Sequence, residues 1–450
     1  MRFLLLLSFI LAGTGLAADR PNVVFIFVDD MGWGDASCYG GKFPTPNIDR
    51  LAREGTLFRQ FYVASPICSP SRCGVITGQF PARWRINSYL QTKAGNRECE
   101  QADFLDPQAP SMPRAFKVAG YATAHIGKWH LGGGRDVTEA PKFAAYGYDL
   151  GLGTYESPEP VAALGLKTTP WEKRREPQQV ARHDRTRWMV DQTVEFLKTN
   201  RDRPCFVNLW FDDVHTPYVP SDEQLADLPE GPGTVQYRAV LRDTDQQVGR
   251  LLDALRDLEI EPNTLVMLAG DNGPQPSFER ARTGGLRGMK WSLYEGGIRT
   301  PFIVRLPGVV PANVVNDTSV VCAVDFLPTL CRMAGIPAPD AAFDGEDLSA
   351  VFRGARTPRS KPLFWEYGRK PGEAGKVKGG FPYPNEPDSK SPNIAVRDGD
   401  WKLLVHADGT QAELYHLARD PNESKNLAAS EKETAKRLQK AALEWRRALP

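Results

Sequence analysis

Four short runs of apolar residues predict buried β-strands. They cover residues 22–28, 122–126, 205–211 and 264–269, and most of them are rich in β-branched or aromatic side chains. Continuous apolar runs of this length are typical of parallel strands that are covered on both faces. Because segments with helical patterns separate them, we predict an α/β fold with a mostly parallel central sheet.

The segments between these runs carry helix signals. Residues 46–54 are expected to form a helix that Thr45 caps, with Pro46 in its first turn. Residues 111–119 have the same character, and residues 237–256 repeat apolar side chains along one helical face. Helices on both faces of the sheet are therefore expected.

Polar side chains follow the predicted strands directly. Asp29 and Asp30 come after the first strand, and Asp271 and Asn272 follow the strand at 264–269. Two adjacent carboxylates repel each other unless a cation or water lies nearby, and carboxylate and amide oxygens suit calcium or magnesium. Each pair alone is also compatible with a solvated turn. Parallel strands would bring both pairs to one edge, where such sheets bind ligands.

The composition changes near residue 353. Residues 368–392 are rich in glycine, proline and lysine and are predicted to form a long loop. Residues 394–405 resemble a hairpin that turns at Asp398-Gly399, and a last helix is expected from about Glu431, with Ser430 and Glu433 as a capping box. The predicted units are a signal peptide at 1–18, a catalytic domain at 19–355 and a smaller C-terminal α+β subdomain at 356–450.

The amino terminus indicates export. Met1-Arg2 is positively charged, residues 3–12 are apolar, and small residues precede Ala17 and Ala18. This pattern predicts a secretory signal peptide and a periplasmic or secreted enzyme. A membrane anchor is the alternative, but the run is short for a bilayer, and no later segment predicts a membrane span.

Charge and cysteine content narrow the functional classes. The 56 basic and 55 acidic residues give a formal net charge of +1, which lacks the basic excess of a nucleic-acid-binding protein. An anionic substrate would therefore need a local cationic pocket. Seven cysteines are an odd number, so at least one has no partner within the chain, and any disulfide pairing stays open.

The segment 66–78 carries the most specific chemistry. It reads Pro-Ile-Cys-Ser-Pro-Ser-Arg-Cys-Gly-Val-Ile-Thr-Gly. Ser69 is expected to cap a helix with Pro70 at its first position, so that free N–H groups and Arg72 face an anion. Cys68 stands just before this site, although a lone cysteine is also often a buried structural thiol.

The run Cys68-Ser69-Pro70-Ser71-Arg72 resembles the signature of the formylglycine-dependent sulfatases, notably the arylsulfatase A-like and N-acetylgalactosamine-6-sulfatase-like members. The resemblance implies an alkaline-phosphatase-like fold. It also implies that a formylglycine-generating maturation enzyme oxidises Cys68, and that the hydrate of the formylglycine supplies the nucleophilic oxygen.

The resemblance assigns further roles by motif. Lys128 and Lys290 would bind the sulfate, and His130 would assist breakdown of the sulfated enzyme. His215 would bind the sulfate and protonate the leaving oxygen. The implied ligands of one Ca²⁺, or Mg²⁺, are Asp29, Asp30, Asp271, Asn272 and the group at Cys68.

These features predict an exported hydrolase of sulfate esters, with a sulfated carbohydrate as substrate. The sugar, the sulfated position and exo or endo action stay open. One alternative is a phosphatase or phosphodiesterase of the same superfamily, which usually holds two metals with more His and Asp ligands. Another is a non-enzymatic carbohydrate-binding relative, which would lack Cys68, Lys128 or His215.

Substrate choice is expected to reside in loops. Trp84 is a candidate wall that packs against a sugar. The long loop is compatible with a flexible, solvated segment. The alternative hypothesis is that its basic residues fold over the pocket and contact further anionic groups of the substrate. Arg282 and Arg287 are expected to be solvated or structural. The loop residues are Arg369, Lys370, Lys376 and Lys378.

Overall fold

A computed structural model describes residues 20–164, 179–368 and 381–450. The predicted signal peptide and the basic loop residues between 369 and 378 lie outside the described residues. None of the described helices is both long enough and apolar enough to cross a membrane. The described cysteines form no disulfide bond.

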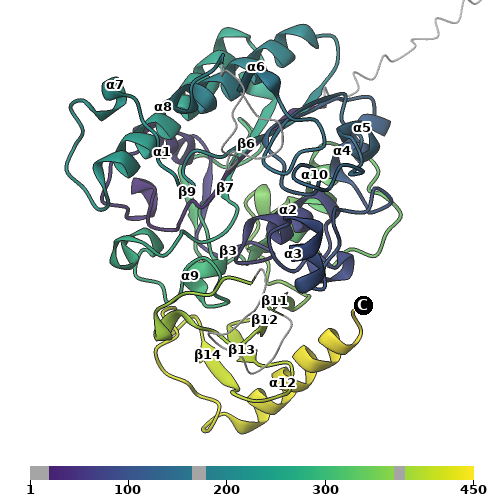
Figure 1. The fold of residues 1–450 in the computed structure, drawn as a ribbon, viewed down its shortest axis with the longest axis vertical. Helices are drawn as coiled ribbons and strands as arrows, with labels where there is room; N and C mark the ends of the chain where they lie inside the picture. Colours follow the sequence, from purple (N-terminus) through teal and green to yellow (C-terminus); the bar gives the residue numbers. More distant parts are fainter. Residues whose placement is uncertain (1–19, 165–178, 369–380) are drawn as a thin grey trace, which may run out of the picture.

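An eight-stranded, mostly parallel sheet forms the centre of the molecule (Figure 1). All four apolar runs form strands of this sheet, as predicted. The strands in spatial order are β5 (Leu150–Thr154), β4 (Ala122–Lys128), β6 (Cys205–Phe211), β1 (Asn22–Val28), β7 (Thr264–Gly270), β8 (Phe302–Arg305), β2 (Thr56–Phe58) and β9 (Val314–Asn316). A two-stranded sheet pairs β3 (Phe61–Tyr62) with β10 (Val321–Cys322).

The register brings the ends of the parallel strands to one level. Val28 of β1 pairs with Phe211 of β6 on one side and with Gly270 of β7 on the other. On β4, Gly127 pairs with Trp210 of β6. The residues that follow these four strands therefore meet at one edge of the sheet, which is the edge where the sequence predicts a ligand site.

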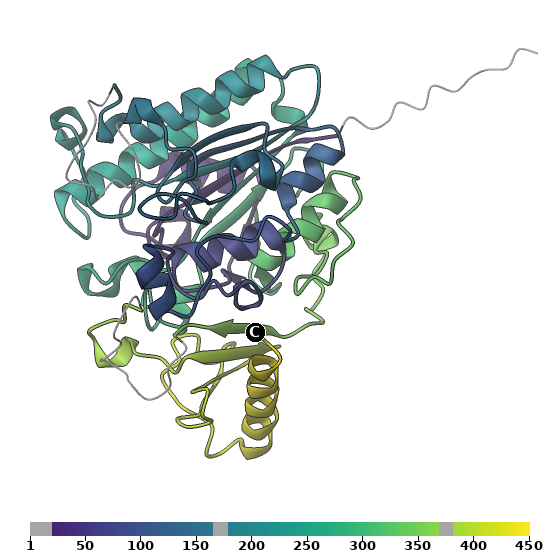
Figure 2. The ribbon, with the colours of Figure 1, turned by 45° about the vertical axis from the view of Figure 1, so that its right-hand side comes forward.

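Alternate side chains of the strands enter two separate cores. On β1, Val24 and Ile26 face one core while Phe25 and Phe27 face the other, as the period of two in a strand requires. Helices cover both faces, as Figure 2 shows. One layer contains α1 (Pro46–Arg53), α6 (Arg185–Thr199) and α8 (Val235–Asp257), and the other contains α2 (Cys68–Thr77), α4 (Met112–Val118) and α10 (Phe326–Met333). Shorter helices are α3 (Lys93–Glu98), α5 (Phe143–Tyr146), α7 (Asp222–Leu225), α9 (Glu295–Ile298) and α11 (Ser349–Phe352).

The C-terminal part of the chain forms a small α+β unit below the central sheet in Figure 1. Its four antiparallel strands are β11 (Leu363–Glu366), β12 (Ile394–Asp398), β13 (Trp401–Val405) and β14 (Glu413–His416), and α12 (Lys432–Arg447) packs on them. The predicted α+β character is confirmed, and the boundary at residue 355 stays a prediction.

Two local predictions at this end of the chain are corrected. Asp398 pairs with Trp401, so the hairpin turns at Gly399-Asp400, one residue later than predicted. Ser430 does not cap α12, because its hydroxyl donates to the carbonyl of Leu427 instead.

The predicted cap of α1 is also absent. The helix begins after Thr45 as expected, but the Thr45 hydroxyl accepts a hydrogen bond from the backbone N–H of Ser37 at 2.9 Å and makes no cap. The side-chain oxygen that could satisfy the first turn is already engaged, so Asp245 on α8 accepts from the N–H groups of Asn47 and Ile48.

Candidate active site

The four predicted metal ligands meet at the carboxyl edge of the sheet. The backbone N–H of Asp30 donates to Asp271 Oδ1 at 2.9 Å, and Asn272 Nδ2 donates to Asp30 Oδ1 at 2.7 Å. One ligand atom each from Asp29, Cys68 and Asp271 lies within 4.8 Å of the other two. All of these side chains are buried. This geometry agrees with the prediction that β1 and β7 bring the Asp29-Asp30 and Asp271-Asn272 pairs together.

Several oxygens of this cluster accept no hydrogen bond from the described residues. They are Asp29 Oδ1, Asp30 Oδ2 and Asn272 Oδ1, all buried. Buried oxygens without a donor are costly and call for a partner. Hard oxygen atoms from three carboxylates and one amide are suitable ligands for Ca²⁺ or Mg²⁺. The residues present therefore fit one divalent cation.

Three cationic side chains surround the carboxylates. Lys128 Nζ lies 2.5 Å from Asp29 Oδ2, and Arg72 Nη2 lies 2.6 Å from Asp271 Oδ2. Burial alone would raise the pKa of Asp29, but Lys128, His215 and Arg72 outweigh it and hold this pKa well below its usual value. Burial and the charge of Asp29 raise the pKa of Asp271 to about 7.

Lys290 completes the cationic set on the other side of Cys68. Its Nζ lies 2.6 Å from Asp30 Oδ1, and its side chain is almost fully buried. Lys128 Nζ lies 3.4 Å from Cys68 Sγ. Two buried ammonium groups therefore flank residue 68 and could stabilise negative charge there.

Cys68 is the first residue of α2, which begins two residues earlier than the predicted start at Pro70. Ser69 consequently lies inside the helix and does not cap it; its hydroxyl instead accepts from the N–H of Leu90 at 2.9 Å. Burial raises the pKa of the Cys68 thiol to about 12. The unmodified thiol is therefore protonated at neutral pH and is a weak nucleophile.

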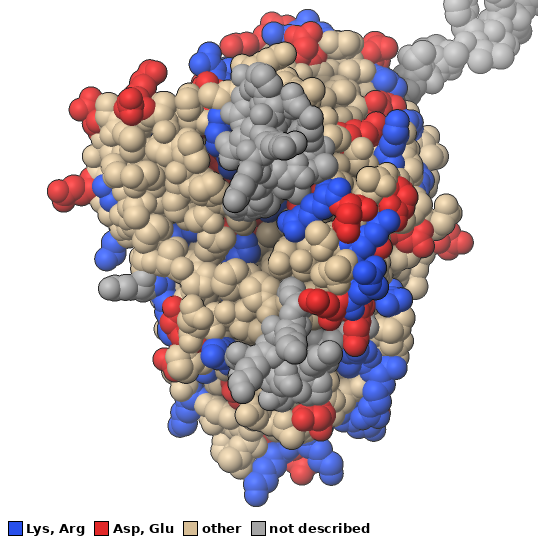
Figure 3. Space-filling model, viewed as in Figure 1, with Lys and Arg blue, Asp and Glu red and all other residues tan. Residues whose placement is uncertain are grey.

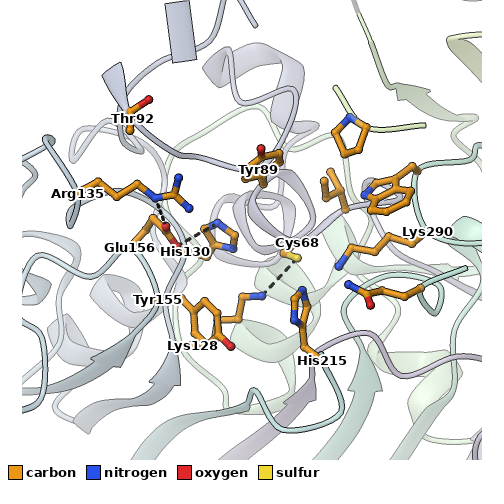
Figure 4. Close-up of a pocket in the computed structure, with 14 residues that line it drawn as sticks. Cys68, Tyr89, Thr92, Lys128, His130, Arg135, Tyr155, Glu156, His215 and Lys290 are labelled. Carbon is orange, nitrogen blue, oxygen red and sulfur yellow. Dashed lines mark hydrogen bonds and ion pairs between the residues drawn. The ribbon is translucent and has the colours of Figure 1, made fainter. Parts of the chain in front are cut away.

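His215 and His130 lie on either side of Lys128 in Figure 4. His215 Nδ1 donates to the carbonyl of Thr216 at 2.6 Å, because a carbonyl can only accept. Its Nε2 lies 3.6 Å from Asp30 Oδ2. Burial and Lys290 lower the pKa of His215 to about 4, so the ring is neutral near pH 7.

These side chains open into a cavity of about 680 Å³ (Figure 4). Arg72 and four of the five predicted metal ligands, all except Cys68, do not line this cavity and are buried behind its wall. The predicted residues that line it are Cys68, Lys128, His130, His215 and Lys290. The lining residues that the sequence did not identify are Ile67, Tyr89, Thr92, Arg135, Tyr155, Glu156, Gln275, Trp291 and Pro382.

Tyr155 and Glu156 were missed for a clear reason. They follow β5, whose sequence Leu-Gly-Leu-Gly-Thr contains two glycines and has no continuous apolar run. The general rule that ligands bind after parallel strands would have found both residues if this strand had been recognised.

Trp84 is not a wall of the cavity. Its indole N–H donates to Gln79 Oε1 at 3.1 Å, and its ring packs on the core. Tyr89 and Trp291 line the cavity instead. The structural role predicted for Arg282 agrees with its contacts, since its buried guanidinium pairs with Asp35 at 2.8 Å. Arg287 likewise contacts the C-terminal unit, at Tyr415.

Comparison with known proteins agrees with this site. Residues 21–336 match the family model described as Sulfatase. The chain belongs to the sulfatase family. Residues 289–447 also match the model described as N-sulphoglucosamine sulphohydrolase, C-terminal. Membership, together with relatives that are named sulfatases, makes the chain a sulfuric ester hydrolase, as predicted.

Relatives and solved structures extend over nearly the whole chain. Pig (Sus scrofa) N-acetylgalactosamine-6-sulfatase is 30% identical, over 98% of this chain and 88% of that protein. Human (Homo sapiens) arylsulfatase A is 30% identical, over 92% and 84%. The structure of Ps i-CgsB in complex with k-i-k-neocarrahexaose is similar with a TM-score of 0.75 and 25% identity, over 95% of this chain and 93% of that one. The alkaline-phosphatase-like fold of this sulfatase is therefore confirmed.

Proposed function

We propose that this sulfatase hydrolyses sulfate esters of a carbohydrate, with formylglycine at position 68 and one bound Ca²⁺, for which Mg²⁺ is the alternative. The observation that carries the proposal is the arrangement around Cys68. Lys128 and Lys290 flank it, and His130 and His215 line the same cavity. Directly behind it lie carboxylates with oxygens that accept no hydrogen bond from the described residues.

Lys128 and Lys290 would bind the sulfate group and stabilise charge that develops on its oxygens. Both are buried, and nearby acidic groups outweigh the effect of burial, so that their pKa values are raised and they stay charged. In a site with little water such charges act more strongly than at the surface. Arg72 supports this clamp from behind, since it holds Asp271 and donates to the carbonyl of Lys128 at 2.9 Å.

Asp29, Asp30, Asp271 and Asn272 would hold the cation, whose charge lowers the pKa of an oxygen bound to it and offsets the charge of the sulfate. When position 68 is formylglycine, its hydrate has one hydroxyl to attack sulfur and a second whose deprotonation releases sulfate. The thiol of Cys68 has a raised pKa and is a weak nucleophile, although it lies in a cavity lined by cationic side chains. This supports the proposal that the modified residue, and not the thiol, is the nucleophile.

The two histidines would move protons at the two ends of the reaction. Since His215 Nδ1 is engaged with Thr216, its Nε2 is the atom that can deliver a proton to the leaving oxygen. A sulfate anion beside His215 would favour its protonated form and so raise a pKa that is low without substrate. His130 would take a proton from residue 68 when sulfate is released.

The cavity and the relatives support a carbohydrate substrate. The space of about 680 Å³ is far larger than a sulfate ion, and the rings of Tyr89 and Trp291 provide aromatic surface beside polar groups. Relatives carry names that refer to N-acetylgalactosamine-6-sulfate, and Ps i-CgsB was solved with k-i-k-neocarrahexaose. A phosphatase with two metal ions is less compatible, because the described residues offer one group of acidic and thiol ligands and Lys128 and Lys290 line the cavity beside it.

The amino-terminal pattern supports export as part of the same proposal. Sequencing the first residues of enzyme recovered from the periplasm or medium tests it, and cleavage after Ala17 or Ala18 is expected.

Paired substrates test the proposed activity. The chain is coproduced with a formylglycine-generating enzyme and assayed on matched aryl sulfate and aryl phosphate, then on defined sulfated oligosaccharides. We expect a preference for sulfate and turnover of at least one sulfated sugar. A preference for phosphate would refute the proposal, and hydrolysis of aryl sulfate alone would refute its carbohydrate part.

A further inference from the structure

A buried carboxylate lies behind His130 on the side away from Cys68 in Figure 4. The Glu156 side chain is 1% exposed, and its Oε2 lies 3.3 Å from His130 Nε2. Its Oε1 accepts from Arg135 Nε at 2.7 Å. Oε2 accepts no hydrogen bond from the described residues, so one oxygen of a fixed carboxylate is free to pair with the imidazole.

The backbone at this cluster is held in an unfavourable conformation. His130, Arg135, Tyr155 and Glu156 have positive φ angles of 54°, 48°, 51° and 36°. Residues with a Cβ rarely adopt this region, and such residues concentrate at functional sites where the surroundings hold them in place. All four side chains line the cavity.

The sheet explains how His130 and Glu156 meet. Lys128 of β4 pairs with Thr154 of β5, so each of the two residues lies two positions beyond its strand end. The ladder continues past the strands, because the N–H of His130 donates to the carbonyl of Tyr155 at 3.1 Å. The position of Glu156 beside His130 thus follows from the register of the sheet.

The contacts of His130 also determine which ring nitrogen carries the proton. Nε2 lies 3.2 Å from the carbonyl of Leu90, which can only accept, and 3.3 Å from Glu156 Oε2. Nδ1 is buried and has no hydrogen-bond partner among the described residues. In the neutral ring Nε2 therefore holds the proton, and the lone pair of Nδ1 is available as a base.

We propose that Glu156 is a positioning residue that keeps the proton on His130 Nε2 and stabilises the imidazolium, with Arg135 fixing Glu156 from the other side. The inference rests on the proposed function. His130 Nδ1 would accept the proton of the free hydroxyl at residue 68. The electron pair of the broken O–H bond would form the C=O bond of the aldehyde. The bond from carbon to the sulfate oxygen would break at the same time, and its electron pair would leave with sulfate. A small turn of the ring completes the hydrogen bond to Glu156, and such bonds are often long before substrate binds.

The kinetic test separates this role from a structural one. Glu156→Gln should slow sulfate release and leave the earlier expulsion of the alcohol unchanged. The turnover number kcat should then fall roughly 10- to 150-fold, the factor that a hydrogen bond to a charged group contributes. KM should fall by the same factor, so that kcat/KM is retained and a burst of alcohol equal to the enzyme precedes the slow steady state. Glu139→Gln is the matched control, because Glu139 forms an ion pair with Lys93 at 2.6 Å and does not line the cavity.

A spectroscopic readout does not depend on turnover. Nitrogen NMR of histidine-labelled, full-length enzyme with unmodified Cys68 should show the Nε2–H form of His130, assigned with His130→Asn. Glu156→Gln should shift this equilibrium, and Glu156→Asp should restore it in part. An Nδ1–H form in the unsubstituted enzyme overturns the inference even if the variants fail to fold.

The two proposals fail in distinguishable ways. Absence of aryl sulfate turnover by the unsubstituted enzyme would reject the proposed function while the tautomer of His130 still reports on Glu156. Suppose instead that the unsubstituted enzyme turns over normally. If Glu156→Gln then has unchanged kinetics, or loses kcat and kcat/KM equally, only the role of Glu156 is rejected.

Discussion

Replacing Lys402 with methionine removes an ammonium group that lies between two buried carboxylates. Lys402 Nζ, on β13, lies 3.0 Å from Glu295 Oε1 of α9 and 2.9 Å from Glu423 Oε1. All three side chains are 0% exposed. The cluster joins the C-terminal unit to the large sheet domain, since Glu295 belongs to the latter.

The loss should be large because both carboxylates stay buried in the variant. Breaking a buried ion pair by removing one partner costs about 3–5 kcal/mol of unfolding free energy. Burial and Glu295 raise the pKa of Glu423 to about 7 even though Lys402 lowers it. An unfolded glutamate titrates near about 4.3, so the folded state binds the proton more tightly. Stability from this group is present below about pH 4.3 and is lost as the pH rises towards 7.

Urea denaturation at pH 5 and pH 8 measures the effect. In Lys402→Met the pKa of Glu423 should rise further, and the pKa of Glu295, which is lowered in the unsubstituted protein, should rise although Arg299 stays 3.4 Å away. The destabilisation should therefore be greatest at pH 8 and smaller at pH 5. Lys425→Met, at an exposed lysine of the same unit, is the control and should change stability by less than about 0.5 kcal/mol. The reasoning is refuted if Lys402→Met costs less than about 1 kcal/mol at pH 8, or costs the same at both pH values.

Three further predictions concern the site. Cys68→Ser should fold normally but stop after at most one turnover, because serine has no second hydroxyl with which to release sulfate. Mass spectrometry of the intact protein should then show the sulfated form. Sustained turnover by this variant would contradict the proposal that residue 68 acts as formylglycine. Removal of divalent ions with a chelator should lower activity and thermal stability together, since it leaves Asp29, Asp30 and Asp271 mutually repelling, and Ca²⁺ should restore both. Neutralising the basic residues between 369 and 378 should raise KM for a sulfated oligosaccharide at low salt and spare a small aryl sulfate, whereas equal effects on both would reject a role in recognition.

The sequence predicts the architecture and most of the site well, for physical reasons. The strands at 22–28, 205–211 and 264–270 are covered on both faces, so their apolar runs are continuous and easy to recognise. Because parallel strands end together, the positions of Asp29 and Asp271 could be predicted without knowing the loops. The roles of Cys68, Lys128 and Lys290 could be predicted because these residues match specific family motifs.

The remaining features depend on contacts that the sequence does not display. Ser69 fits a cap by type, but the helix begins two residues earlier than predicted, at Cys68, and the Ser69 hydroxyl accepts from the N–H of Leu90 instead. Glu156 belongs to no motif, and its place beside His130 follows only from the pairing of β4 with the glycine-rich β5. On the face in Figure 3 basic and acidic side chains lie side by side, mainly on the right and along the edges.

The activity of preparations that differ in the modification of residue 68 tests the central claim most directly. Coproduction with varying amounts of the maturation enzyme gives a series in which peptide mass spectrometry measures the fraction of formylglycine at position 68. Specific activity on an aryl sulfate should rise linearly with that fraction and extrapolate to zero at zero conversion, with all preparations saturated with Ca²⁺. Activity that stays constant across the series, or that persists when all of residue 68 is cysteine, would contradict the account.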